Sequence, residues 1–315
     1  MILKILRPLV GIILIFTIIF FLDLETITDL LINIKLSWFY LAVLLTFLSC
    51  LVGSLRYKKI LAERKLMLDF FFLLKIYLEG VALITLLPVG HIGIDAWRTQ
   101  AIKKNSDFSY LKIINTLFSD RISGFLGLVI VSASSSIIIY FFNINILNVF
   151  PEIKIMQIPF FFFFLVTSLL IIVGTIATYF ASKLLQTIFS NFTKFKNFLI
   201  YINEALNPLI IFKSLPYSLI NNLFVMSAFL FCCKSIDLNI PYLLILSISI
   251  AIIIPSLLPF AIGGFGPRET GVVIIFSLFG IGLEEAFICS VLFGITITIQ
   301  GIIGGIIFIL PQKKM

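Results

Sequence analysis

The side chains in this sequence that could do chemistry are arginines and carboxylates set in strongly apolar surroundings. Arginine binds carboxylate and phosphate groups through two parallel hydrogen bonds, so an arginine held in an apolar region suits an anionic ligand. The ionisable residues at such positions are Lys75, Glu79, Asp95, Arg98, Asp120, Arg121, Arg268 and Glu269. A charge at the centre of a membrane costs at least about 2.5–3.5 kcal/mol on insertion scales, so this many charges favour function over packing.

Two of the arginines follow breaks that are rich in Pro and Gly. The segment LLPVGHIGIDAWR covers residues 86–98, and LLPFAIGGFGPRE covers residues 257–269. We expect a helix to restart after each break, capped by Asp95 in the first segment and preceded by Gly266 in the second. Arg98 and Arg268 would then lie in first turns, beside free backbone N–H groups that suit a phosphate or carboxylate.

A competing interpretation is that Pro and Gly merely kink packed helices while the charges neutralise one another. Lys75 and Glu79 are four residues apart, and Asp95 and Arg98 are three apart. Both spacings favour ion pairs along one helix. Under this interpretation the charges hold the fold together and bind nothing.

Composition places the chain in a membrane. Of its 315 residues, 61% are hydrophobic and 12% are charged, whereas a globular domain has about 45–50% apolar residues. The apolar runs are continuous rather than alternating, which predicts helices and not a β-barrel.

The net charge of +8 comes from short clusters between apolar runs, so nucleic-acid binding is not expected. The spacing of Cys and His predicts no metal site, and no cofactor motif is present.

Hydrophobic length predicts six full spans and two broken stretches. The expected spans are Pro8 to Leu22, Leu36 to Leu55, Thr116 to Phe142, Ile158 to Phe180, Pro216 to Cys233 and Ala286 to Leu310; the broken stretches are Phe70 to Leu87 and Tyr242 to Ile262. If both broken stretches are re-entrant hairpins, the basic loops, Arg56 included, fall on the cytoplasmic side with both termini. The alternative fold has eight spans.

The re-entrant arrangement makes the two halves, about 1–145 and 146–315, an inverted repeat. Each half then holds three spans and one hairpin in opposite orientation. The two broken segments are also similar in sequence, since Pro88 aligns with Pro259 and Gly93 with Gly264. Interrupted segments at corresponding positions of two halves mark a transporter's binding site. We therefore expect breaks at Pro88, Gly93 and Pro259.

Three segments resemble a known family. LLPVGHIGIDAWR, SDRISGFLGL and PFAIGGFGPRETGVVI are similar to the membrane domain of lysylphosphatidylglycerol synthases, the flippase-like or UPF0104 family, in which this domain moves aminoacylated phospholipid between leaflets. The resemblance implies a single membrane domain over residues 1–315, without the soluble synthase domain. The implied substrate-binding positions, with Asp95 added from the charge pattern, are Asp95, Arg98, Asp120, Arg121, Gly263, Gly264, Gly266, Arg268 and Glu269.

The function expected from residues and resemblance together is translocation of a phospholipid or lipid-linked headgroup, anionic or phosphate-containing, across a prokaryotic cytoplasmic (inner) membrane. One alternative is a membrane-embedded transferase acting on a lipid carrier. Another is a non-catalytic membrane partner of a lipid-modifying enzyme. Self-association as a homo-oligomer is compatible with each of these.

Overall fold

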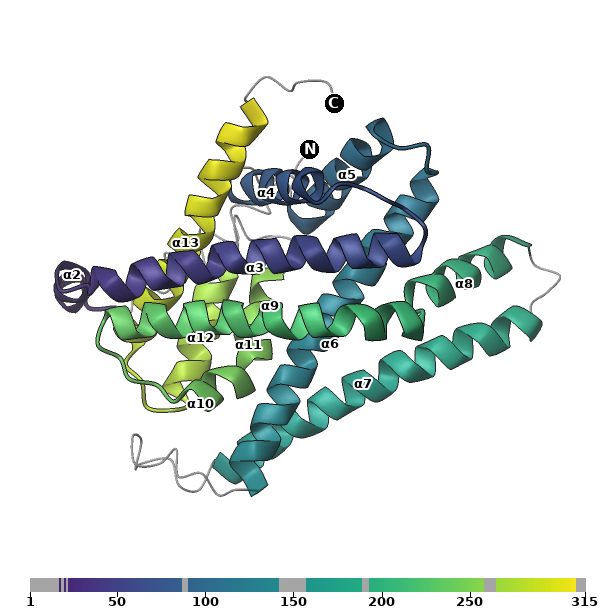
Figure 1. Ribbon diagram of the computed structural model, residues 1–315. Coiled ribbons are helices and arrows are strands. Elements are labelled where there is room, and N and C mark those ends of the chain that lie inside the picture. Colours follow the sequence, from purple (N-terminus) through teal and green to yellow (C-terminus); the bar gives the residue numbers. More distant parts are fainter. Residues whose placement is uncertain are drawn as a thin grey trace.

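The computed structural model describes residues 22–86, 90–141, 157–188, 193–257 and 265–309, together with Thr17 and Phe20. These residues are folded into helices joined by turns, which confirms the predicted all-α class (Figure 1). The helices are α2 (Leu24–Ile32), α3 (Leu36–Glu63), α4 (Phe70–Leu86), α5 (Gly90–Lys104), α6 (Tyr110–Phe141), α7 (Gln157–Ile188), α8 (Thr193–Ala205), α9 (Pro208–Ser235), α10 (Tyr242–Ser247), α11 (Ser249–Ile253), the 3-10 helix η3 (Ile254–Leu257), α12 (Pro267–Ser277) and α13 (Leu283–Ile309).

Five helical stretches in the described ranges are long and apolar enough to cross a membrane: Leu36–Glu63, Tyr110–Phe141, Leu165–Ile188, Lys196–Ser235 and Leu283–Ile309. At a rise of about 1.5 Å per residue, each exceeds a hydrocarbon core of about 30 Å. They contain or overlap five of the six predicted spans. The sixth, Pro8 to Leu22, lies almost wholly outside the described residues.

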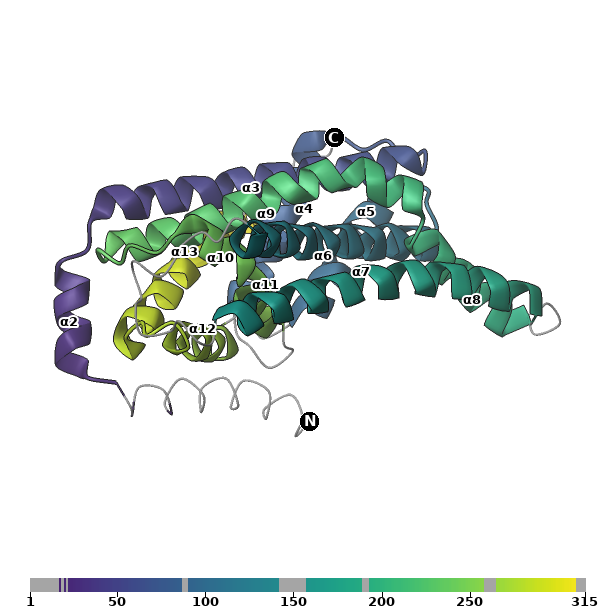
Figure 2. The same ribbon diagram turned by 90° about the horizontal axis from the view of Figure 1, so that it is seen from below.

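Helices α3 and α9 run antiparallel and side by side across the molecule, and α6 crosses them (Figures 1 and 2). At one end, Lys213 Nζ lies 2.6 Å from Glu63 Oε2. At the other, the backbone N–H of Lys35 donates to Ser235 O at 2.8 Å, and Lys35 also pairs with Asp237. We call the end near Lys213, where Lys59 and Arg64 also lie, the basic end, and the end near Asp237 the acidic end.

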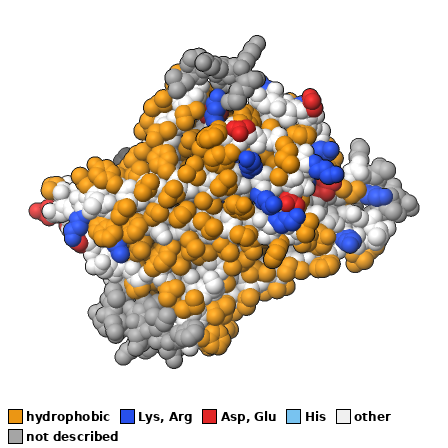
Figure 3. All heavy atoms as spheres, viewed as in Figure 1, with side chains coloured by type: hydrophobic (Ala, Val, Ile, Leu, Met, Phe, Trp, Pro, Cys, Tyr) orange, Lys and Arg blue, Asp and Glu red, His pale blue; other side chains and the backbone are white. Residues whose placement is uncertain are grey.

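The outer surface is largely apolar, as a lipid-facing surface must be. Hydrophobic side chains cover most of the face in Figure 3, while many of the Lys and Arg side chains gather toward the side where α8 lies. Tyr40 and Leu44 of α3, which are 65% and 53% exposed, belong to this apolar surface.

The first broken stretch folds as two helices that pack on each other. Trp97 Nε1 of α5 donates to Glu79 Oε2 of α4 at 3.2 Å. The start of α4 and the end of α5 meet the basic end of α3 in one core cluster, formed by Leu61, Leu66, Leu73, Ala101, Ile102 and Ile113 among others. Both arms of this hairpin therefore open toward the basic end, and residues 87–89, Pro88 included, lie outside the described residues.

The second broken stretch has a corresponding arrangement at the opposite end. A Cβ on Gly271 of α12 would lie 2.7 Å from Pro255 of η3, so these two elements are in close contact. The start of α10 and the end of α12 meet the end of α9 in another core cluster, with Ile236, Leu244 and Phe276. Residues 258–264, which include Pro259, Gly263 and Gly264, lie outside the described residues.

The two halves thus repeat one order of elements: a long helix, a broken hairpin and a second long helix. The second long helix of each half packs on the hairpin of the other half. Helix α13 makes extensive contact with α4, and α6 contacts α10 and α11. Gly301 and Gly304 of α13 permit this approach, because a Cβ there would collide with Thr85 and with the Leu78 carbonyl.

Replacing Gly304 with Ala should therefore destabilise the protein. Over-packing of a close contact costs about 1–3 kcal/mol, and the carbonyl that the new Cβ meets belongs to the backbone of α4. Thermal unfolding of the purified protein in detergent measures the effect. Gly174→Ala in α7 is the control, since nothing lies within 4 Å of a Cβ there. Equal unfolding temperatures for the two variants would contradict the close α4 and α13 contact.

Candidate functional site

A cavity of about 490 Å³ lies where the two hairpins face each other. Val81 and Ile94 line it from the first hairpin, and Ile253, Ser256 and Arg268 from the second. The remaining walls come from the long helices α3, α6, α9 and α13. The two broken segments therefore meet at one cavity, although they are separated by well over a hundred residues in the chain.

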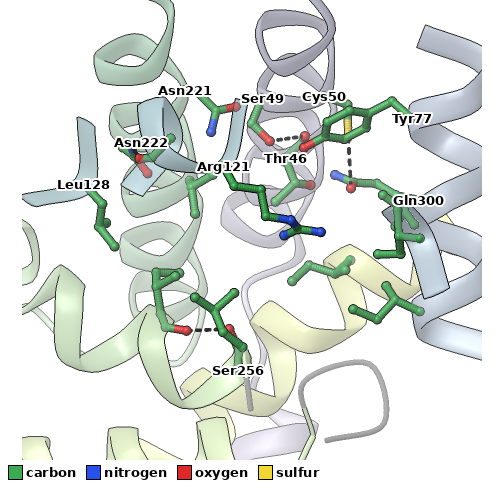
Figure 4. Close-up of a pocket in the computed structure, with 18 of the residues that line it drawn as sticks. Thr46, Ser49, Cys50, Tyr77, Arg121, Leu128, Asn221, Asn222, Ser256 and Gln300 are labelled. Atoms are coloured by element: carbon green, nitrogen blue, oxygen red, sulfur yellow. Dashed lines mark hydrogen bonds between the residues drawn. The ribbon is translucent and has the colours of Figure 1, made fainter. Parts of the chain in front are cut away.

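Most of the lining is apolar, but four arginines contribute to it: Arg56, Arg98, Arg121 and Arg268. Figure 4 shows Arg121 in the middle of the cavity, between Thr46 and Ser49 on one side and Ser256 on the other. Gln300 of α13 lies on a further wall and accepts a hydrogen bond from Cys50 Sγ at 3.2 Å. An apolar cavity with a few convergent polar groups is the usual form of a ligand site.

Asp120 of α6 binds two of the arginines. Its Oδ1 lies 2.7 Å from Arg56 Nε of α3, and its Oδ2 lies 3.4 Å from Arg98 Nη1 of α5. All three side chains are buried. The Arg98 guanidinium also stacks over the Tyr57 ring, 4.3 Å from its centroid, a cation–π contact that strengthens where water is excluded. This cluster joins three helices at one carboxylate.

The neighbouring residue, Arg121, pairs with Asp95 of α5. The guanidinium donates from Nε at 2.8 Å and from Nη2 at 3.0 Å to the two carboxylate oxygens, which is the bidentate geometry. These side chains are 38% and 30% exposed, so this pair is the more accessible part of the site. Adjacent residues of α6 thus pair with residues three apart on α5, which fixes α5 against α6.

Arg268 and Glu269 form the corresponding group of the second hairpin. Glu269 Oε1 accepts from Arg268 Nη2 at 2.7 Å and from Ser290 Oγ at 3.2 Å, while Oε2 accepts from the backbone N–H of Gly266 at 2.6 Å. Gly266 has φ of 94°, a conformation that favours glycine. Glu269 therefore caps α12 and pairs with Arg268 at once, as expected for the first turn of this helix.

Arg268 is 1% exposed, and its Nη1 has no hydrogen-bond partner among the described residues. The guanidinium lies 4.9 Å from the Phe265 ring centroid, and a Cβ on Gly294 of α13 would collide with it. A buried donor left unsatisfied costs free energy that a ligand oxygen can recover. Arg268, which lines the cavity, therefore has one guanidinium nitrogen without a hydrogen bond.

Three expectations for the first hairpin are wrong. Helix α5 begins at Gly90, so Asp95 does not cap it and Arg98 lies beyond its first turn. Gly93 lies inside α5 and is not part of the break. Asp95 and Arg98 do not pair with each other, because α6 offers each of them a partner of opposite charge. The expected pair between Lys75 and Glu79 is present at 3.9 Å.

Among the predicted site residues, the structure brings the three arginines, Asp120 and their partners Asp95 and Glu269 to one place, and Gly266 starts the helix that carries Arg268. Sequence reasoning missed Arg56, which was assigned to a basic cytoplasmic loop. Helix α3 continues to Glu63, so Arg56 lies inside it and is 8% exposed. Gln300 was also missed, since no pattern distinguished it within an apolar run.

Fold and site together define the class: an all-helical membrane protein with an arginine-rich cavity between two broken hairpins. The family model described as the lysylphosphatidylglycerol synthase TM region matches residues 5–305, so the chain belongs to that family, as its motifs predicted. No curated protein matches the chain as a relative. Membership supports a role connected with membrane lipid.

Substitutions at the Asp120 cluster should have unequal effects on stability. Asp120→Asn leaves two buried guanidinium groups without a counter-charge, and breaking a buried pair costs about 3–5 kcal/mol. Arg98→Gln should cost less than half as much, because Asp120 keeps Arg56 at 2.7 Å. Thermal unfolding in detergent compares the two variants. Equal losses would show that Asp120 does not serve both arginines.

Proposed function

We propose that this protein is a lipid translocase that moves a lipid with an anionic, phosphate-containing headgroup between the leaflets of a membrane. The observation that carries the proposal is the placement of four arginines in one largely apolar cavity between the two hairpins. The guanidinium groups suit a phosphate, and the apolar lining suits the adjoining acyl chains. A volume of about 490 Å³ accommodates a headgroup and not a whole lipid.

The repeated order of elements supports transport over chemistry. We propose that the halves form an inverted repeat whose hairpins are re-entrant, since the first opens toward the basic end and the second toward the acidic end. Two halves of this kind around a central site suit alternating access. The exchanged packing of α13 on α4 and of α6 on α10 gives each half a surface against which to move.

The charges at the helix ends support an orientation. Lys59, Arg64 and Lys213 gather at one end. The acidic residues Asp23 and Glu284 lie together at the other end, where the Asp23 backbone N–H donates to Glu284 Oε1 at 3.1 Å. Basic residues favour the cytoplasmic side. We therefore propose that the basic end and both termini are cytoplasmic, in the inner membrane of a prokaryote.

The direct test is translocation in liposomes that contain the purified protein. Phospholipids with a fluorescent acyl chain are placed in both leaflets, and dithionite added outside quenches the accessible fraction. Wild-type protein should expose the inner-leaflet lipid to quenching, beyond the fraction quenched in protein-free liposomes. Identical quenching in the two kinds of liposome would refute the translocase.

The double variant Arg268→Gln/Glu269→Gln tests the proposed site. It removes a buried ion pair without leaving one charge unpaired, and the amide introduced in place of the Glu269 carboxylate keeps an oxygen to cap Gly266. Loss of a charged hydrogen bond of about 1.5–3 kcal/mol predicts a rate reduced about 10- to 100-fold. The matched control is Lys35→Gln/Asp237→Asn, which removes an exposed pair at the acidic end. Full activity in the first variant would remove Arg268 from the site.

Mass spectrometry of the same liposomes separates the alternatives. A chemically altered lipid would favour a transferase, with Asp95, Asp120 and Glu269 as the candidate acids. Unaltered lipid that stays in its leaflet, with a tightly bound enzyme co-purifying from the native membrane, would favour a non-catalytic partner.

A further inference from the structure

The charges at the cavity are unequal in number. Four arginines line it: Arg56, Arg98, Arg121 and Arg268. Within the described residues, three carboxylates pair with them: Asp95, Asp120 and Glu269. Four minus three leaves one positive charge, and residues 87–89 and 258–264, which connect the hairpin arms, are all uncharged. One negative charge on a ligand restores neutrality, whereas a second would be uncompensated in apolar surroundings.

Four buried side-chain atoms on the lining residues have no hydrogen-bond partner among the described residues. In the part of the chain that the structure describes, three buried nitrogens of lining residues lack a partner: Arg98 Nε, Arg268 Nη1 and Gln300 Nε2. The fourth atom is an acceptor, the neutral Oδ1 of Asn221. Glu79 also has a free carboxylate oxygen, but Glu79 lies in the contact between α4 and α5 and does not line the cavity. Three of these four atoms are donors, so a bound anion can satisfy more of them than a bound cation can.

An ammonium group would compete with arginines for most of its usual partners. The three carboxylates already bind guanidinium groups, and four aromatic rings near the cavity lie close to an arginine. Arg98 lies over Tyr57 and Tyr77, at 4.3 and 5.7 Å from the ring centroids. Arg268 lies over Phe265 and Phe293, at 4.9 and 5.7 Å. At these four rings a second cation would have to displace an arginine.

We infer that the cavity selects a lipid whose headgroup is a monoanionic phosphodiester without an amino group. This inference rests on the proposed translocase function and adds the substrate class. Zwitterionic and aminoacylated headgroups place an ammonium among the arginines, so they bind poorly. The site thereby differs from one built for the aminoacylated lipid after which the family is named.

The test uses the same liposomes with lipids that share one labelled acyl chain and differ in headgroup: phosphatidylglycerol, phosphatidylcholine, phosphatidic acid and lysylphosphatidylglycerol. Phosphatidylglycerol should move at least about tenfold faster than the other three, equivalent to about 1.4 kcal/mol. Equal rates for the four lipids would overturn the headgroup inference, and so would a faster rate for any of the other three than for phosphatidylglycerol. Either result would leave the translocase proposal standing. If no lipid of the series moves, the translocase itself is refuted.

Two variants change the charge of the cavity in a predictable way. Asn221→Asp is nearly isosteric and adds a carboxylate. The rate for lysylphosphatidylglycerol divided by the rate for phosphatidylglycerol should therefore rise about tenfold. Arg98→Gln removes the surplus charge while Asp120 keeps Arg56, so the preference for phosphatidylglycerol over phosphatidylcholine should fall toward one. The control for Asn221→Asp is Asn33→Asp, which makes the same change at the exposed end of α2. Unchanged headgroup ratios in folded Arg98→Gln would overturn the charge argument, even if Asn221→Asp does not fold.

A binding measurement separates a lipid from a soluble phosphodiester. Short-chain phosphatidylglycerol and glycerophosphoglycerol, which carry the same headgroup, are titrated against the detergent-solubilised protein by calorimetry, with inorganic phosphate as a third ligand. The short-chain lipid should bind at least about tenfold more tightly than either, because its acyl chains reach the apolar lining. Equal affinity for glycerophosphoglycerol or phosphate would assign the site to a soluble ligand and overturn the inference.

Discussion

A charge among apolar helices must keep a partner of opposite sign, and Asp120 meets this constraint for two arginines at once. Removing either guanidinium from water is costly, and the shared carboxylate compensates the cost only while α3, α5 and α6 stay together. The bidentate pair between Arg121 and Asp95 then fixes α5 a second time. The position of the first hairpin, and hence one wall of the cavity, depends on these pairs.

Glycines on the long helices make room for the paired arginines. A Cβ on Gly124 of α6 would lie 2.8 Å from the Arg56 guanidinium, and one on Gly294 of α13 would collide with that of Arg268. Helices α6 and α13 are the long helices that follow the two broken stretches in the chain. Each half therefore uses a glycine on its second long helix to admit a buried arginine. The guanidinium groups of these two arginines thus occupy space that larger side chains at the glycine positions would otherwise fill.

The sequence predicted the helices far better than their charge contacts. Apolar length alone identifies the long helices, since a chain in lipid must satisfy its own backbone. The pairing of Asp95 with Arg121 could not be predicted, because it depends on how α5 packs against α6 and not on spacing along one helix. Arg56 was misplaced for a related reason. Apolarity ends near Leu55, but the helix continues to Glu63, and Arg56 inside it pairs with Asp120 of α6.

A transporter must bind its ligand strongly enough to take it up and weakly enough to release it. If the four arginines were unpaired, a phosphate would be bound too tightly to leave; if every charge were matched, the cavity would offer a lipid anion little more than an apolar surface. Three carboxylates compensate three of the four positive charges, and in the proposed translocase the modest attraction that remains suits entry from one side and release to the other. In the proposed translocase the carboxylates would limit the affinity for the lipid as well as hold the arginines in place.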